Sequence, residues 1–98
     1  MEPELIALIE RRRKAIDTLR AILIETLHVQ ALPEAIDPDA PLFGTGLALD
    51  SVDALELVVA SEQSFGVSLP ENELRQSLRS INALVDLLFY LQDTQGEP

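Results

Sequence analysis

The sequence predicts an all-α domain: a four-helix bundle with three main helices, a short third helix and a long loop between the first two helices. Apolar residues make up 47% of the chain but aromatic residues only 4%, so the core has to be aliphatic. These aliphatic side chains recur at steps of three and four residues, which is the helical period. Ninety-eight residues fit one domain with a modest core and leave little room for a deep catalytic cleft, which favours a binding or carrier module.

The first helix is expected from about Pro3 to His28, with the proline in the first turn and the histidine at the end that the helix dipole favours for it. Residues 16–27 are expected to face the core, and the domain core to cover about residues 15–92. Residues 1–14 then form an N-terminal helical extension with a basic run, Arg11 to Lys14. A solvated helix face explains this run most simply; contact with a partner, an acidic patch of another copy or a phosphate stays open.

From Val29 to Leu49 the helical period disappears, and prolines and glycines, among them Gly44 and Gly46, interrupt any regular element. A loop of this length in a small domain usually carries function or wraps the core. It contains five apolar residues that are expected to anchor it: Leu32, Ile36, Leu42, Phe43 and Leu47. We expect the loop to cross the bundle and to bring Ser51 to one end of it.

The second helix is expected to start at Asp50 or Ser51 and to end at Phe65, with Gly66 as its C-terminal cap. Asp50 as N-cap and Asp53 three residues later resemble a capping box. At about 100° per residue, one side of this helix is the core side and carries Ala54, Leu57, Val58, Ser61 and Phe65. The opposite side carries three aliphatic residues among acids: Val52, Leu55 and Val59, with Asp53, Glu56 and Glu62.

This second side is predicted to be a docking surface, because an exposed aliphatic stripe set among acids is typical of one. Arginine or lysine side chains of a partner would pair with the acids while its apolar residues bury the stripe. The alternative is that a neighbouring helix or the long loop covers this side.

Two further helices complete the bundle. Pro70 opens a short third helix that runs to about Ser77, and Ser80 caps a fourth that runs to about Gln92. The fourth helix is expected to bury Ile81, Leu84, Val85 and Leu88. Residues 93–98 are expected to form a flexible, solvated tail.

The net charge of −10 lies entirely in the part from Glu34 onward, because acids and bases cancel before it. Such a surface disfavours nucleic acid and anionic lipid and favours basic partner surfaces. The chain has no cysteine and one histidine, so thiolate and histidine metal sites are not expected, and Asp37, Asp39 and Asp50 lack the spacing of a calcium loop. Any thiol has to arrive on a cofactor.

The sequence has no secretory signal pattern and no apolar run long enough to span a bilayer, so we expect a cytoplasmic protein without membrane insertion.

Ser51 is the polar residue most clearly presented for chemistry, because it follows a helix-capping aspartate at the point where the loop becomes a helix. Backbone N–H groups and the positive end of the helix dipole favour a phosphate there. A simple capping dipeptide is the plain alternative. A hydrolytic nucleophile is disfavoured, because His28 is the one possible imidazole base and is expected at the far end of another helix. We therefore expect no catalytic residues and no enzyme.

The segment Gly46-Leu47-Ala48-Leu49-Asp50-Ser51-Val52-Asp53-Ala54-Leu55-Glu56-Leu57-Val58 resembles the Asp-Ser-Leu region of acyl carrier proteins. The segments 37–43, 65–70 and 81–91 are similar to the loop before that motif, to the end of the second helix with the start of the third, and to the last helix of this family. Roughly residues 15–92 are covered, in the order and spacing of the family.

The resemblance implies a four-helix bundle that is modified by a phosphopantetheinyl transferase. This enzyme would move 4′-phosphopantetheine from coenzyme A to the oxygen of Ser51, with Asp50 as the helix cap beside the attachment site, and release adenosine 3′,5′-bisphosphate. The arm would supply the thiol that carries acyl groups as thioesters. By matching position, six residues are candidates to line an acyl cavity: Leu57, Val58, Ser61, Leu69, Leu74 and Leu84.

The sequence also departs from the pattern of fatty-acid carriers. Val52 replaces the usual leucine, the loop before the serine reads Gly-Leu-Ala-Leu-Asp-Ser, and Ser61 stands at a position that is usually aliphatic, where it either alters the cavity or bonds back to the carbonyl of Leu57. We therefore predict a stand-alone acyl carrier protein of a specialised fatty acid, lipid or polyketide pathway. A peptidyl or D-alanyl carrier and an unmodified helical adaptor remain as alternatives.

The expected partners are the transferase and acyl-loading, ketosynthase or acyltransferase enzymes with basic docking surfaces. No nucleic acid partner is expected, and we expect a monomer.

Overall fold

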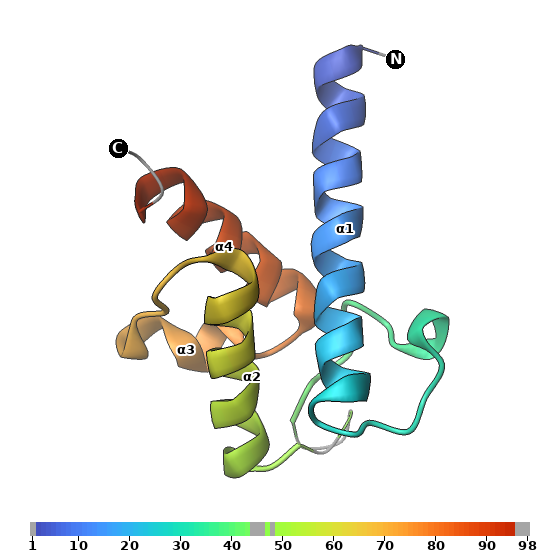
Figure 1. Cartoon of the computed structure of the whole chain (residues 1–98), viewed down its shortest axis with the longest axis vertical. Helices are drawn as coiled ribbons and strands as arrows, with labels where there is room; N and C mark the ends of the chain where they lie inside the picture. The colour runs from blue at the N-terminus through green and yellow to red at the C-terminus, as the bar shows by residue number, and fades with distance from the viewer. Residues whose placement is uncertain (1, 44–46, 48, 96–98) are drawn as a thin grey trace.

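The computed structural model describes residues 2–43, 47 and 49–95, and in this part of the chain it contains four α-helices and no strand (Figure 1). The helices are α1 (Pro3–Glu25), α2 (Ser51–Phe65), α3 (Glu71–Ser77) and α4 (Ile81–Gln95). α1 packs against α2 and α4, and α3 packs against α4. The prediction of an all-α bundle with a short third helix and a long loop after the first is confirmed.

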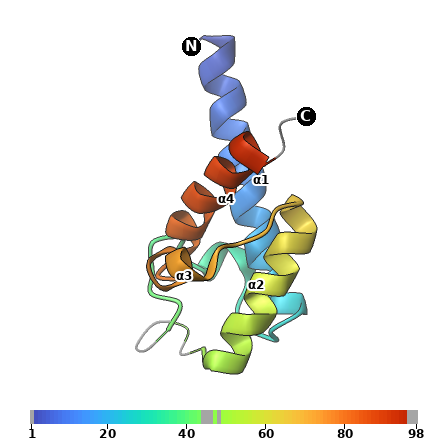
Figure 2. The same cartoon turned by 90° about the vertical axis from the view of Figure 1, so that its left-hand side faces the viewer.

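α1 is the longest helix of the described part, with 23 residues against 15 each in α2 and α4. Its 23 residues span about 35 Å at 1.5 Å per residue, close to the 38 Å long axis of the molecule. Its four buried residues, Ala15, Leu19, Ile22 and Leu23, all lie in the second half. Figures 1 and 2 show the first turns projecting past the other helices. The prediction that the second half faces the core is confirmed.

α1 ends at Glu25 and not at His28, so the predicted C-terminal boundary is wrong by three residues. Two hydrogen bonds with non-helical spacing end the helix. The N–H of Leu27 donates to the carbonyl of Ile22, and the N–H of Val29 donates to the carbonyl of Leu23. His28 lies between these bonds with a φ of 62°, in the left-handed region. The histidine is therefore a loop residue beyond the helix.

The loop after α1 contains one turn of 3₁₀-helix, η1 (Pro33–Ala35), and wraps the core as predicted. Ile36 and Leu42 are buried and Phe43 and Leu47 are half-buried, whereas Leu32 is 67% exposed, so its predicted role as an anchor is wrong. Gly44 and Gly46 lie outside the described residues.

Polar contacts also fix this loop to the helices. Arg20 of α1 donates from Nε and Nη2 to the carbonyl of Ile36 at 3.0 and 2.9 Å. Further along, the N–H of Leu42 donates to the carbonyl of Arg79 at 3.0 Å, and the N–H of Asn82 donates to the carbonyl of Pro38 at 3.0 Å. The loop therefore crosses the α3–α4 turn before it returns to the start of α2.

α4 begins as predicted and ends later. The Oγ of Ser80 accepts the N–H of Ala83 at 3.1 Å, which is the predicted cap. The helix continues to Gln95, three residues into the predicted flexible tail, because the side chain of Gln95 bonds both the N–H and the carbonyl of Ser68. Residues 96–98 lie outside the described part.

The basic run of α1 fastens the helix to α4. Arg12 donates to Asp86 at 2.9 Å and to the side chain and carbonyl of Asn82. Arg11 donates to Gln92 at 2.8 Å and lies over the ring of Phe89, 3.9 Å from its centroid. A fully solvated face is therefore the wrong interpretation for the first two arginines of the run.

Candidate functional site

Ser51 is the first residue of α2 and is exposed at one end of the bundle. Asp50 takes the extended backbone conformation of an N-cap, with φ −101° and ψ −176°. Leu49 just before it is held by its N–H, which donates to the carbonyl of Leu42 at 3.2 Å. The loop therefore brings Ser51 to an accessible position, as the sequence predicts; Gly46 and Ala48 of the same motif lie outside the described residues.

The predicted capping box is present at this helix start. The N–H of Asp53 donates to Asp50 Oδ1 at 2.9 Å, and the N–H of Asp50 donates to Asp53 Oδ2 at 3.0 Å. The N–H groups of Ser51 and Val52 are the ones in this first turn that the box does not use. They lie at the positive end of the helix dipole, next to the hydroxyl oxygen of the serine.

The aliphatic stripe of α2 is exposed as predicted. Val52 is 63%, Leu55 65% and Val59 44% exposed. The alternative that a neighbouring helix or the loop covers this side is wrong for the described residues. Beside the stripe lies a shallow groove of about 410 Å³, in which Thr26 of the α1 end faces α2. The sequence carried no signal for Thr26, because it is a polar residue within the segment 16–27 that is expected to face the core.

The three acids of this side are not equivalent. Asp53 belongs to the capping box, and Glu62 is half-buried and accepts the N–H of Leu69 at 2.7 Å through Oε2. Glu56 is exposed and has no hydrogen bond or ion pair to another residue of the described part. Glu56 is therefore the carboxylate of this side that is free to meet a partner without giving up an internal bond.

The opposite side of α2 faces the core. Among the six residues predicted to line an interior cavity, Leu57, Ser61, Leu69 and Leu84 are buried, and Val58 and Leu74 are partly buried against the same core. Ser61 is fully buried, and its Oγ has no hydrogen-bond partner among the described residues. Of the two alternatives for Ser61, the back-bond to the carbonyl of Leu57 is therefore wrong.

Chemistry of other kinds finds no support in the described part of the chain. His28 is exposed in the loop after α1. Asp37 accepts the N–H of Asp39, and Asp39 accepts Asn82 Nδ2 at 2.6 Å, so these two acids serve the loop. No group of three or more His, Cys, Asp or Glu that could hold a metal ion occurs among the residues described.

Residues 2–43, 47 and 49–95 contain no helix with both the length and the apolar character to cross a membrane.

Comparison with known proteins gives a consistent result. The family described as a phosphopantetheine attachment site matches residues 17–88. The acyl carrier protein of Thermosynechococcus vestitus is 33% identical over 73 residues, which is 74% of this chain and 85% of that protein. The acyl carrier protein of Helicobacter pylori is 33% identical over 81% of this chain and 92% of its own length, and that of Akkermansia muciniphila is 29% identical over 82% and 91%. The matched residues include all of α2 and α3 and the first half of α4.

Proposed function

Because the chain belongs to the acyl carrier protein family, whose members bear phosphopantetheine and are carriers and not catalysts, we propose that its 4′-phosphopantetheine is attached to the Oγ of Ser51. The observation that carries this proposal is the exposed hydroxyl at the first position of α2, inside the matched region. Because the matched family is defined by its phosphopantetheine attachment site, the alternative of an unmodified helical adaptor is set aside.

The residues around Ser51 fit a phosphodiester. The hydroxyl is exposed, so a transferase reaches it without opening the bundle. Two N–H groups of the first turn and the positive end of the helix dipole favour a negative charge at this position. Asp50 and Asp53 bond each other's backbone N–H groups, so the helix start keeps its shape whether or not the oxygen of the serine is substituted.

When bound, the arm supplies the thiol that this cysteine-free chain lacks, and acyl groups are carried on that thiol. The chain's own residues then position the attachment point and present it to partner enzymes. Asp50 and Asp53 fix the first turn of α2, and Gly66, in the left-handed conformation with φ 68°, ends the helix. The rigid helix between them holds the attachment point and the exposed stripe in one fixed relation.

We propose that the enzymes that modify, load and unload the carrier dock on the exposed side of α2, through Val52, Leu55, Val59 and Glu56. Three aliphatic side chains next to the attachment point offer burial, and the net charge of −10 favours partners with basic surfaces. Asp53 and Glu62 add negative charge to this side. Asp53 also accepts the N–H of Asp50, and Glu62 accepts the N–H of Leu69.

Charge reversal at Glu56 tests this docking surface. Glu56→Lys is expected to lower kcat/KM for the transferase by about fivefold to fiftyfold at low salt, because an attractive contact becomes repulsive, and to leave the thermal midpoint unchanged. Glu34→Lys, an exposed glutamate in η1, is the matched control with the same charge change. Equal rates for both variants and the wild type would remove the docking argument.

For the cargo, we propose acyl groups of a specialised fatty acid, lipid or polyketide pathway, with a peptidyl or D-alanyl carrier as the second candidate. The relatives are named acyl carrier proteins, which supports acyl cargo. Ser61 puts a hydroxyl inside the aliphatic core, which supports a cargo different from that of a carrier with a fully aliphatic interior. The mass of the thioester on protein isolated from its natural source tests this proposal, and an aminoacyl cargo would decide for the second candidate.

The modification itself is tested with purified protein, coenzyme A, Mg²⁺ and a broad-specificity phosphopantetheinyl transferase. The intact mass is expected to rise by one phosphopantetheine per chain. Ser51→Ala is expected to abolish the gain, and Ser64→Ala, an exposed serine of the same helix, to keep it. A gain that survives Ser51→Ala would overturn the proposed attachment site.

A further inference from the structure

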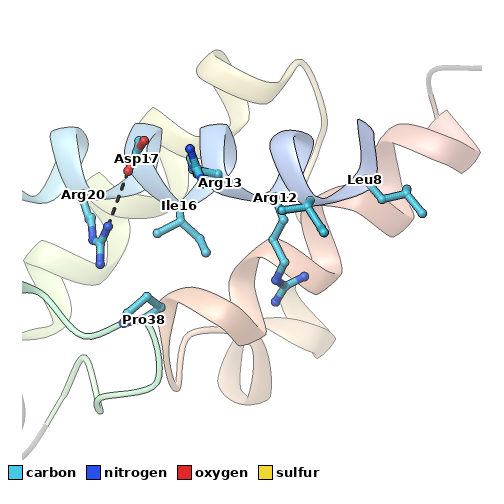
Figure 3. Close-up of a pocket in the computed structure, with 8 residues that line it drawn as sticks. Leu8, Arg12, Arg13, Ile16, Asp17, Arg20 and Pro38 are labelled. Carbon is cyan, nitrogen blue, oxygen red and sulfur yellow. Dashed lines mark hydrogen bonds and ion pairs between the residues drawn. The ribbon is translucent and has the colours of Figure 1, made fainter. Parts of the chain in front are cut away.

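The first turns of α1 carry apolar side chains that the bundle leaves exposed. Leu5 is 47%, Leu8 60% and Ile9 44% exposed, although the helix around them is fully formed. Next to them lies a groove of about 530 Å³, the floor of which includes Ile16 and Pro38 (Figure 3). Neither α2 nor α3 contributes a residue to this groove.

One face of the helix joins the exposed turns to the groove. Leu5, Ile9 and Ile16 recur at steps of four and seven residues and therefore lie on one side of α1. Figure 3 shows Ile16 directed from α1 toward the side of Pro38 and Arg12 directed toward α4, with Arg13 on the other edge of the helix. An apolar stripe thus begins near the N-terminal end of α1 and continues into the groove.

The charges along this stripe are divided by position. Glu2 precedes the apolar residues of this stripe, and Arg12 and Arg13 follow them. A second copy of the same helix in the antiparallel direction puts Glu2 of each copy next to the arginines of the other, whereas Glu4 and Glu10 lie to the sides of the stripe. A parallel copy would put acids against acids and arginines against arginines, which is repulsive.

We propose that the first turns of α1 are a self-association surface, on which two copies pair antiparallel about a two-fold axis between Leu5 and Ile9. Leu5 of one copy packs near Ile9 of the other, and Glu2 of each copy reaches the arginines of its partner. In a two-fold pair each such contact occurs twice. The proposal concerns a surface apart from Ser51 and from the docking side of α2, and it replaces the expectation of a monomer.

Arg13 is the side chain of this surface that is best placed to pair. Arg12 already bonds Asp86 and Asn82. Arg13 is 67% exposed, and its contact within the chain is an ion pair of 3.6 Å with Glu10, a weak surface interaction. A guanidinium in this position is free to turn toward a carboxylate of a second copy.

The size of the surface sets the strength of the pairing. About ten residues of helix give a contact about 15 Å long. This is smaller than the roughly 1,200–2,000 Å² interfaces of stable complexes, so the dimer is weak and depends on concentration. We expect a Kd between about 10 µM and about 1 mM.

Sedimentation of the full chain over that range of concentration tests the association. The weight-average mass is expected to rise from monomer toward dimer. The Ile9→Glu variant is expected to stay monomeric at all concentrations. The Leu32→Glu variant, changed at an exposed leucine outside α1, is expected to associate like the wild type. A wild type that stays monomeric, or an Ile9→Glu variant that still associates, overturns the proposal. A monomer that binds anionic lipid vesicles through these turns would also overturn it, in favour of a lipid surface.

Charge reversals test the antiparallel direction. Glu2→Arg and Arg13→Glu are each expected to weaken the dimer about tenfold, because two attractive pairs become repulsive. An equimolar mixture of the two variants is expected to associate like the wild type, since Arg then faces Glu in both contacts. Lys14→Glu is the matched control for Arg13→Glu, because Lys14 is exposed on another side of α1 and does not line the groove, and it is expected to leave the Kd unchanged.

Two results overturn the antiparallel direction. Either the single charge reversals leave the Kd of the dimer unchanged, or the mixture of the two variants associates as weakly as each variant alone. Circular dichroism checks that each variant keeps its helices. All variants are expected to accept phosphopantetheine at the wild-type rate, so a failure of the self-association is distinguishable from a failure of the proposed attachment site.

Discussion

Replacement of Ser61 by alanine is expected to stabilise the protein. The side chain is fully buried on the core side of α2, and its Oγ has no hydrogen-bond partner among the described residues. Folding therefore removes this hydroxyl from water without replacing its hydrogen bonds. Alanine keeps the same Cβ and removes the unsatisfied atom, so Ser61→Ala relieves a cost that the folded state now bears.

The expected gain follows from three terms. An unsatisfied buried hydroxyl costs about 1–3 kcal/mol in mutational data. Alanine adds up to about 0.5 kcal/mol of helix propensity over serine. The few dispersion contacts of one lost oxygen, at about 0.1–0.2 kcal/mol each, oppose these gains by about 0.5–1 kcal/mol. These terms sum to between about 0 and 3 kcal/mol, and the middle of this range is a rise of about 1–2 kcal/mol in the free energy of unfolding, which raises the Tm of a domain of this size by about 4–16 °C.

Urea and thermal denaturation of the unmodified protein, followed by circular dichroism, measure this effect. Ser64→Ala is the matched control. Because Ser64 is exposed on the same helix, its replacement changes only the intrinsic helix propensity. Its free energy of unfolding is expected to change by no more than about 0.5 kcal/mol. If Ser61→Ala gains nothing over Ser64→Ala, or lowers the stability, the hydroxyl has a partner in solution and the reasoning is refuted.

Two further substitutions test the parts of the fold that hold α2 and α1. Gly66→Ala is expected to lower the free energy of unfolding by about 1–2 kcal/mol, because a Cβ at φ 68° is strained although no atom lies within 4 Å of it; Gly66→Asn is expected to lose less, and equal stability of all three forms in urea denaturation would contradict this. Arg12→Met is expected to lower it by about 0.5–1.5 kcal/mol through the lost bonds to Asp86 and Asn82. Lys14→Met, on the exposed side of the same turn, is the control for Arg12→Met, and equal denaturation midpoints for these two variants would show that Arg12 does not fasten α1 to α4.

Local sequence signals predicted the element that carries the site almost completely. α2 starts and ends at the predicted residues because its caps are local: Asp50 and Asp53 bond each other's backbone, and Gly66 takes a conformation that other residues avoid. The helical period likewise separated the core side of α2, with Leu57 and Ser61, from its exposed side.

The sequence did not predict side-chain contacts between different segments of the chain. Nothing near Glu62 indicates that its carboxylate accepts the N–H of Leu69, and nothing near Gln95 indicates that it bonds Ser68. In the sequence, Arg11 and Arg12 belong to a basic run that is typical of a solvated helix face. Their partners Gln92 and Asp86 lie on α4, 81 and 74 positions later in the chain. The end of α1 was missed for a related reason, because His28 carries none of the usual signals for a left-handed residue such as glycine or asparagine.

Fragmentation mass spectrometry locates the phosphopantetheine that we propose on Ser51. The peptide that contains α2 is analysed after reaction with coenzyme A and a phosphopantetheinyl transferase, because this peptide contains Ser51, Ser61 and Ser64. The added mass is expected on Ser51 alone, and therefore on those fragments that include Ser51. Added mass on Ser61 or Ser64, or an α2 peptide that stays unmodified, would contradict the attachment at Ser51.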